Sequence, residues 1–338
     1  MNKHRSLIVT AAALLFLSPG LWGMVIKIGS IAPARSPWDD ALNAIALEWA
    51  KISNGTIVLK TYPNGIAGSE QDMLRKLRLG TLDGAVFTNI GMAELNPNVH
   101  ALNTPFLMNT KEEFDYVIDK MPPVFVKPVE EKGYKLMLQS LAGWVYFFAN
   151  EKFLYPEDLK KFKISFMSPE PNLKQALEKM GYRMILSETK DVMTALQSGM
   201  VTCIYCTPLV AASAQFFALA PHMLSLPMSP LVGWMVLNNV TWQNIPETYR
   251  GPMIEALRKA AESLNVKTIK LEQEALKAMK EDGLVIHEPP ADAQEKWRAA
   301  SIKGMEDVAG KTYPKETLEE VLALLREFRA KNSRFSLR

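Results

Sequence analysis

Residues 25–62 read VIKIGSIAPARSPWDDALNAIALEWAKISNGTIVLKTY and contain the pattern of a strand, a helix and a second strand. Residues 25–31 alternate apolar and polar side chains, which is typical of a strand. Ser36 provides an N-cap and Pro37 a first-turn proline for a helix that extends to residue 50. The Asn54-Gly55 turn leads into a second strand over residues 56–62. This order predicts an α/β fold with a largely parallel sheet.

The pattern continues and then restarts beyond the middle of the chain. A helix is predicted over residues 69–79 and a short strand over 85–88. In the second part the predicted strands are 135–140, 145–150, 163–167, 183–186 and 201–206, with helices at 172–180 and 191–198. The repetition predicts a second α/β unit, which agrees with a length of 338 residues.

Residues 246–283 form one long helical pattern with a continuous apolar stripe. Such a helix is longer than one small domain is wide, because each residue adds about 1.5 Å. Two interpretations stay open: an ordinary packing helix near the C-terminus, or a helix that bridges two lobes.

The N-terminus has the order of a secretory signal. Lys3 and Arg5 precede an apolar run at residues 7–17, and Ser18-Pro19-Gly20 follows it. We therefore expect a signal peptide at residues 1–23 and a periplasmic protein. An uncleaved inner-membrane anchor is the alternative, because apolar residues continue beyond Gly20. No later stretch approaches the ~20 apolar residues that a membrane-spanning helix needs.

Composition and motifs exclude several classes of function. The net charge of +3 is small and its charges are interleaved, which argues against a nucleic-acid partner. The four histidines are far apart and have no metal-ligand spacing. The chain also lacks the GxxxxGK[ST], GxSxG and HExxH signatures. We expect no cofactor, no metal and no enzymatic activity.

Several strings in order resemble the extracytoplasmic solute-binding proteins of TRAP transporters, the DctP-like C4-dicarboxylate-binding family. They are Tyr62-Pro63-Asn64-Gly65, Arg78-Leu79-Gly80-Thr81-Leu82-Asp83, Pro156-Glu157-Asp158-Leu159-Lys160 and Ala195-Leu196-Gln197-Ser198-Gly199. Each string alone is weak, because NG and GTLD mark turns in many proteins. Together they extend the resemblance over roughly residues 25–300.

The resemblance implies a two-lobed periplasmic-binding-protein-like fold with hinge-crossing strands and a long bridging helix. Lobe I would contain residues 24–142 and about 232–265, and lobe II residues 143–231 and about 266–330. The ligand would lie between the lobes, and the closed form would deliver it to TRAP membrane permease subunits. Some members instead occur beside a tetratricopeptide-repeat lipoprotein, so such a lipoprotein is a candidate partner.

The departures from the family pattern indicate the type of ligand. Arginines that bind carboxylates in other members correspond to Val145 and Ser165, and a ligand-contacting asparagine corresponds to Cys206. A polar position corresponds to Ile31 and an acidic one to Thr88. A buried carboxylate without a cation would cost several kcal/mol. We therefore expect a hydrophobic or uncharged ligand, lipid-like molecules included. The alternative is a sensor or scaffold with a degenerate cleft.

Three further residues complete the candidate site. Phe147 shares the strand face of Val145, Met167 suits an adaptable apolar pocket, and Trp234 is either core or cleft lining. The predicted ligand-binding residues are Ile31, Thr88, Val145, Phe147, Ser165, Met167, Cys206 and Trp234. Cys203-x-x-Cys206 resembles a redox motif, but on a strand the two thiols would point to opposite faces and stay unpaired.

Overall fold

The computed structural model describes residues 23–167, 170–187 and 189–332. Apart from Gly23, the predicted signal peptide at residues 1–23 lies outside these ranges. None of the helices in the described ranges is long and apolar enough to cross a membrane.

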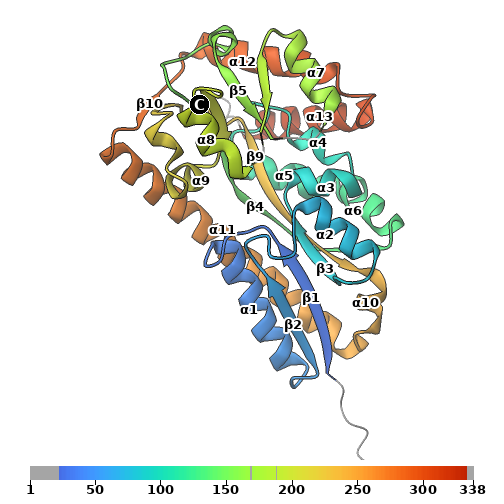
Figure 1. The fold of residues 1–338 in the computed structure, drawn as a ribbon. Coiled ribbons are helices and arrows are strands. Elements are labelled where there is room, and N and C mark those ends of the chain that lie inside the picture. The colour runs from blue at the N-terminus through green and yellow to red at the C-terminus, as the bar shows by residue number, and fades with distance from the viewer. Residues whose placement is uncertain (1–22, 168–169, 188, 333–338) are drawn as a thin grey trace, which may run out of the picture.

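Within the described ranges, ten strands form one mixed sheet (Figure 1). The strands are β1 (Met24–Ser30), β2 (Ile57–Tyr62), β3 (Gly84–Phe87), β4 (Tyr134–Ala149), β5 (Lys163–Phe166), β6 (Arg183–Leu186), β7 (Cys203–Cys206), β8 (His222–Leu224), β9 (Ser229–Asn238) and β10 (Val285–His287). Their order is β2-β1-β3-β9-β4-β7-β5-β6, with β8 joining β4 to β10.

The helices cover both halves of this sheet. They are α1 (Pro37–Ile52), α2 (Glu70–Arg78), α3 (Asn89–Leu95), α4 (Val99–Leu102), α5 (Lys111–Lys120), α6 (Pro122–Glu131), α7 (Pro171–Lys179), α8 (Val192–Gln197), α9 (Pro208–Ser213), α10 (Asn239–Asn244), α11 (Glu247–Glu281), α12 (Ala291–Glu306) and α13 (Lys315–Lys331). Short 3₁₀ helices are η1 (Pro156–Lys161), η2 (Thr189–Asp191) and η3 (Phe216–Ala218).

The α/β prediction is confirmed, but the sheet is less parallel than predicted. β1 pairs in parallel with β2 and β3, and β5 pairs in parallel with β6 and β7. The long strands β4 and β9 are antiparallel to each other and to their other neighbours, β7 and β3. β4 and β9 cross between the two halves of the sheet in opposite directions, and they therefore pair as antiparallel strands.

β4 is a single strand where the sequence predicts two, at residues 135–140 and 145–150. Its pairing with β9 is irregular between Leu141 and Gly143, which marks a bulge, and Gly143 has φ +127°. That backbone conformation favours glycine because it has no Cβ. A Cβ there would also lie 2.2 Å from Oε1 of Glu272 on α11. The glycine therefore bends the strand rather than ending it.

The long helix predicted at residues 246–283 is α11, with 35 residues and a length of about 50 Å. It contacts α1, β4 and α9, and extends from beside α1 to beside α9 (Figure 1). Its buried residues Met253 and Leu264 belong to one hydrophobic cluster, and its buried residue Met279 belongs to another. The bridging interpretation therefore describes this helix.

The C-terminal helix packs with helices of the first half of the chain. α13 contacts α4 and α5, and Leu318, Val321 and Leu325 belong to the same buried cluster as the helices of the first half. The sequence analysis assigned residues about 266–330 to lobe II. That assignment remains a prediction; α13 itself packs against helices within residues 24–142, the range predicted for lobe I.

Candidate functional site

A cleft of about 970 Å³ lies where β4 passes from one half of the sheet to the other. The first half contributes the chain after β1 and the start of α3. The second half contributes β4, β5 and β7, and α7 and α12 cover the far end. Ligand sites in proteins typically measure about 300–1,000 Å³, so this cleft has the size of a binding site.

Most of the predicted site residues meet in this cleft. The lining includes Ile31, Thr88, Val145, Phe147, Met167 and Cys206. Residues separated by up to 175 positions in the sequence, from Ile31 to Cys206, thus surround one space. Their role in binding remains a prediction.

Ser165 and Trp234 do not line the cleft, in contrast to the prediction. Along β5 the flanking residues Ile164 and Phe166 line it, so alternation turns Ser165 to the opposite face of the sheet. There the Ser165 hydroxyl is fully buried and has no hydrogen-bond partner among the described residues.

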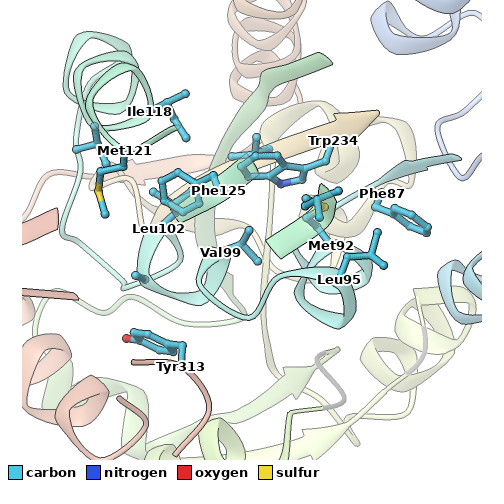
Figure 2. Close-up of a cluster of buried hydrophobic side chains, with 14 of the residues drawn as sticks. Phe87, Met92, Leu95, Val99, Leu102, Ile118, Met121, Phe125, Trp234 and Tyr313 are labelled. Atoms are coloured by element: carbon cyan, nitrogen blue, oxygen red, sulfur yellow. The ribbon is translucent and has the colours of Figure 1, made fainter. Parts of the chain in front are cut away.

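Trp234 lies in the core of the first half, fully buried, with its ring centroid 6.2 Å from that of Phe125 (Figure 2). Its indole N–H donates a hydrogen bond of 2.8 Å to Oδ1 of Asn89, a residue that does line the cleft. The side-chain amide of Asn89 in turn donates to the Pro230 carbonyl at 3.1 Å. Trp234 therefore positions a cleft residue and has no access to the cleft itself.

Aromatic side chains form one wall of the cleft. Phe147 on β4 lies 6.0 Å from Tyr205 on β7, 6.3 Å from Phe106 and 6.2 Å from Trp297 on α12, measured between ring centroids. The Tyr205 hydroxyl accepts a hydrogen bond from the Met167 backbone N–H at 3.3 Å. Burial raises the pKa of Tyr205 to about 12, so this phenol is neutral. The wall is apolar and uncharged.

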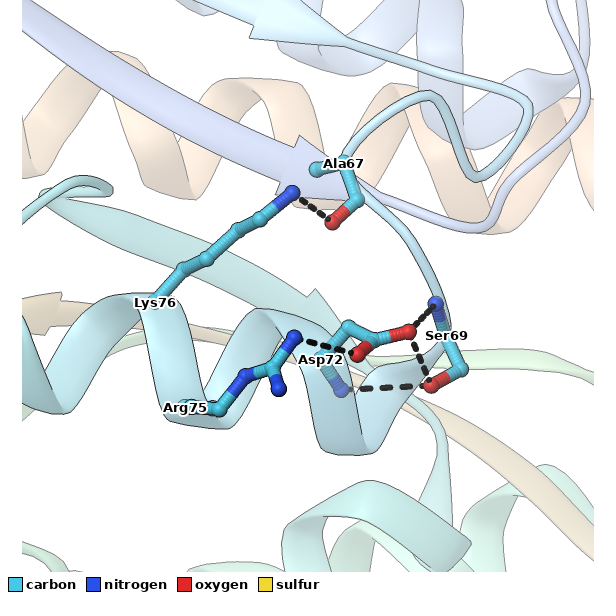
Figure 3. Close-up of polar contacts among 5 residues, drawn as sticks. All are labelled: Ala67, Ser69, Asp72, Arg75 and Lys76. Carbon is cyan, nitrogen blue, oxygen red and sulfur yellow. Dashed lines mark hydrogen bonds and ion pairs between the residues drawn. The ribbon is translucent and has the colours of Figure 1, made fainter.

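Glu70 is a cleft residue that the sequence analysis missed. It follows Ser69, which caps α2: Asp72 N–H donates to the Ser69 hydroxyl at 3.2 Å, and Ser69 N–H donates back to the Asp72 carboxylate at 3.1 Å (Figure 3). The S-x-x-D spacing is a visible start signal for the helix. Only the fold shows that the next side chain, Glu70, turns inward to the cleft.

The Glu70 carboxylate anchors Thr88 at the start of α3. The Thr88 backbone N–H donates to Oε1 of Glu70, and the Thr88 hydroxyl lies 3.1 Å from Oε2. Burial raises the pKa of Glu70, although its hydrogen bonds to Thr88 oppose this effect. A ligand at this end of the cleft would face an acidic side chain.

Positive charge in the cleft is sparse. Its described lining contains no arginine; Lys132 and Lys311 are the cationic side chains there. Lys132 donates to the Glu94 carbonyl at 2.9 Å and is exposed at the rim. His100 also lines the cleft, but burial lowers its pKa and favours the neutral ring. The cleft therefore lacks the bidentate fork that usually holds a carboxylate.

The two cysteines are free and buried on β7. Cys203 packs in the core that contains Phe147 and Trp297, whereas Cys206 packs with Phe148 and Ile204 on the other side. Burial raises the pKa of both thiols, which keeps them protonated. The interpretation as buried, unpaired thiols is confirmed, and the redox interpretation is not.

Comparison with known proteins identifies the family. A model described as bacterial extracellular solute-binding protein, family 7 (DctP), matches residues 28–311. An uncharacterized protein of Haemophilus influenzae is 24% identical over 299 residues, 85% of this chain and 88% of the relative.

Solved structures share the fold. A TRAP periplasmic solute-binding protein from Ochrobactrum anthropi, with its C-terminus bound in the ligand-binding pocket, has a TM-score of 0.84 at 20% identity, covering 94% of this chain and 99% of its own. One from Sulfurospirillum deleyianum with bound succinate has a TM-score of 0.78 at 19% identity, covering 89% and 99%. The chain therefore belongs to the DctP family, the extracellular solute-binding proteins of TRAP-type transport, which are not enzymes.

Proposed function

We propose that this protein binds a predominantly apolar solute in the cleft between its two halves and delivers it to a TRAP membrane permease. The observation that carries the proposal is Val145, which stands on the crossing strand in the cleft wall where a carboxylate-binding arginine was expected. No arginine is present in the described lining, where the cationic side chains are Lys132 and Lys311.

A structural relative points to a different kind of ligand, because the Sulfurospirillum protein was solved with succinate, a dicarboxylate. At 19% identity the likeness shows the fold and leaves the ligand open. In this chain a buried carboxylate would face Glu70 and an aromatic wall. Desolvating it without a paired cation would cost several kcal/mol. This chemistry favours an apolar ligand over a small dicarboxylate.

The alternative, a sensor or scaffold with a degenerate cleft, has less support. A degenerate site would be expected to fill with side chains, since protein interiors pack closely. The cleft instead retains about 970 Å³ of space. Solute binding therefore accounts for the geometry better.

Delivery would follow from closure of the two halves. Proteins of this family work with membrane permease subunits, and a ligand shifts the open–closed equilibrium only by its preference for one form. Export through residues 1–23, the lobe boundaries and a tetratricopeptide-repeat lipoprotein partner remain predictions from the sequence.

The test is Val145→Arg, with Val240→Arg as the matched control. Val145 is 8% exposed in the cleft wall, whereas Val240 is 64% exposed on α10. Isothermal titration with 1-decanol should show binding to the wild type and at least about tenfold weaker binding to Val145→Arg, roughly 1.4 kcal/mol. The control should bind like the wild type. Tight succinate binding by the wild type, with no response to decanol, would overturn the proposal.

A further inference from the structure

A second, smaller cleft lies behind the far end of the binding cleft. It measures about 420 Å³ and is formed by η1, α7 and α12, at the end of the molecule opposite β1 and β2 (Figure 1). The two clefts share four lining residues: Met180, Tyr182, Ala300 and Gly304. The spaces are therefore neighbours, separated by a wall that these side chains form.

The wall is thin at Met180. A Cβ on Gly304 would lie 2.6 Å from the Met180 sulfur, so the thioether occupies the notch that the glycine leaves on α12. Methionine is unbranched and flexible, and it adapts its shape readily to a neighbour. A rotamer change of one side chain could join the two clefts.

The main cleft is apolar on its side of this wall. Leu173 and Leu177 on α7 face Ile164 and Phe166 on β5 across this part of the cleft, and Trp297 on α12 borders it. We call this part of the cleft, between α7, β5 and α12, the apolar arm. It lies in the second half of the protein, whereas Glu70 and Thr88 belong to the first half. Its shape and chemistry suit a hydrocarbon chain.

The outer cleft is charged. Lys160, Lys179 and Lys303 line it, together with the acids Glu157, Glu306 and Asp307. Lys179 lies 3.9 Å from Asp307 with both side chains 55% exposed, which is a weak pair. Lys160 and Lys303 have no ion pair within 4 Å among the described residues. These lysines can bind an anionic group that stays close to water.

We propose that the ligand is a single-chain amphiphile, with its chain in the apolar arm and an anionic head group, a carboxylate or a phosphate, at the lysines of the outer cleft. The inference rests on the proposed function and narrows its ligand. In this arrangement the hydrocarbon chain is buried, whereas the charged head group stays at the solvent-exposed surface. An acid could then bind without a cation inside the main cleft.

The first experiment compares heads on matched chains. Dodecanoate, dodecyl phosphate and 1-dodecanol are titrated, below their micelle concentrations, into the wild type and a Lys160→Glu/Lys179→Glu/Lys303→Glu variant. The control variant is Lys259→Glu/Lys270→Glu, since both lysines are exposed and form weak helix pairs with Glu255 and Glu274.

The triple variant should bind dodecanoate or dodecyl phosphate at least tenfold more weakly and should bind dodecanol like the wild type, and the control should match the wild type with all three ligands. Loss of dodecanoate binding alone identifies a carboxylate head group, and loss of dodecyl phosphate binding alone identifies a phosphate head group. Equal binding of all three ligands by all proteins overturns the inference but leaves the proposed function standing. Binding of succinate without any of the three overturns the proposed function itself.

A second variant tests the passage. Gly304→Leu puts a branched side chain into the notch that the Met180 sulfur occupies. The leucine and the displaced Met180 should then fill the wall between the clefts, so the chain could no longer reach the lysines. Dodecanoate affinity should fall at least fivefold while decanol affinity stays the same. Unchanged dodecanoate affinity in a folded Gly304→Leu protein would show that no chain passes there.

Discussion

Glu272 on α11 lies against the bulge of β4, and its replacement by glutamine should make the protein more stable at alkaline pH. Its Oε1 is buried and has no hydrogen-bond partner in the described part of the chain, and it lies 2.2 Å from where a Cβ of residue 143 would be. The backbone N–H of Trp144 donates to the carboxylate, but burial dominates and raises its pKa to about 7 from an ordinary value of 4.5. Burial, together with the nearby Glu272 carboxylate, raises the pKa of Tyr146 to about 12, so this phenol is neutral at pH 5 and at pH 8.

The sign and size of the effect follow from this pKa. An acid whose pKa is higher in the folded than in the unfolded state holds its proton more tightly when folded. It does not oppose folding below about pH 4.5, and it lowers the free energy of unfolding progressively as pH rises toward 7. Each pKa unit corresponds to about 1.4 kcal/mol, so the loss above pH 7 is on the order of 3 kcal/mol. Glutamine resembles the protonated acid and has no such loss.

Urea unfolding at pH 5 and pH 8 measures the difference. Glu272→Gln should exceed the wild type by about 2–3 kcal/mol at pH 8 and by much less at pH 5. Glu255→Gln on the same helix is the control, because its carboxylate is exposed and Arg258 lowers its pKa. The control should not gain stability at pH 8. A Glu272→Gln difference that is the same at both pH values would refute the reasoning.

Two further predictions concern buried polar groups. Arg329→Met should lower the free energy of unfolding in urea by about 3–5 kcal/mol, because Glu113, with 3% of its side chain exposed, would lose its 2.7 Å ion pair. A double variant that also carries Glu113→Gln should recover part of the lost stability, and no recovery would mean that the destabilisation does not come from the unpaired Glu113. Ser165→Ala should leave the free energy of unfolding within about 1 kcal/mol of the wild-type value or raise it, because the hydroxyl makes no hydrogen bond among the described residues. A loss of stability above about 2 kcal/mol would mean that the hydroxyl has a buried partner.

Local features of the fold were predictable from the sequence. The Ser36 cap of α1 and the strand pattern of β1 involve neighbouring residues, so their signals lie within a few positions. The length of α11 was equally clear, because one apolar stripe continues through it. The family strings then placed Val145 and Cys206, which line one cleft although 61 positions separate them.

Features that depend on distant partners were not predictable. Gly143 looks like a strand end, and only the pairing of β4 with β9 shows that it is a bulge. Trp234 resembles a cleft residue until its hydrogen bond to Asn89, 145 positions away, places it in the core. Glu70 carries no signal of burial, because the capping pattern around it is the same for a solvent-exposed helix start.

The bulge and the cleft wall are adjacent on β4, so a hinge motion at the bulge would couple closure to binding. Gly143 is the bend, and Val145 stands two residues beyond it, facing the cleft from the second half. A change of backbone angle at the bulge therefore moves Val145 relative to Ile31 and Thr88 in the first half. A chain seated mainly against α7 and α12 would stay with the second half during such a motion, because few of its contacts would be to the first. Opening would then expose the cleft end of the ligand while its head remained at the lysines, and the stability of the closed form would depend on the few contacts that cross the cleft.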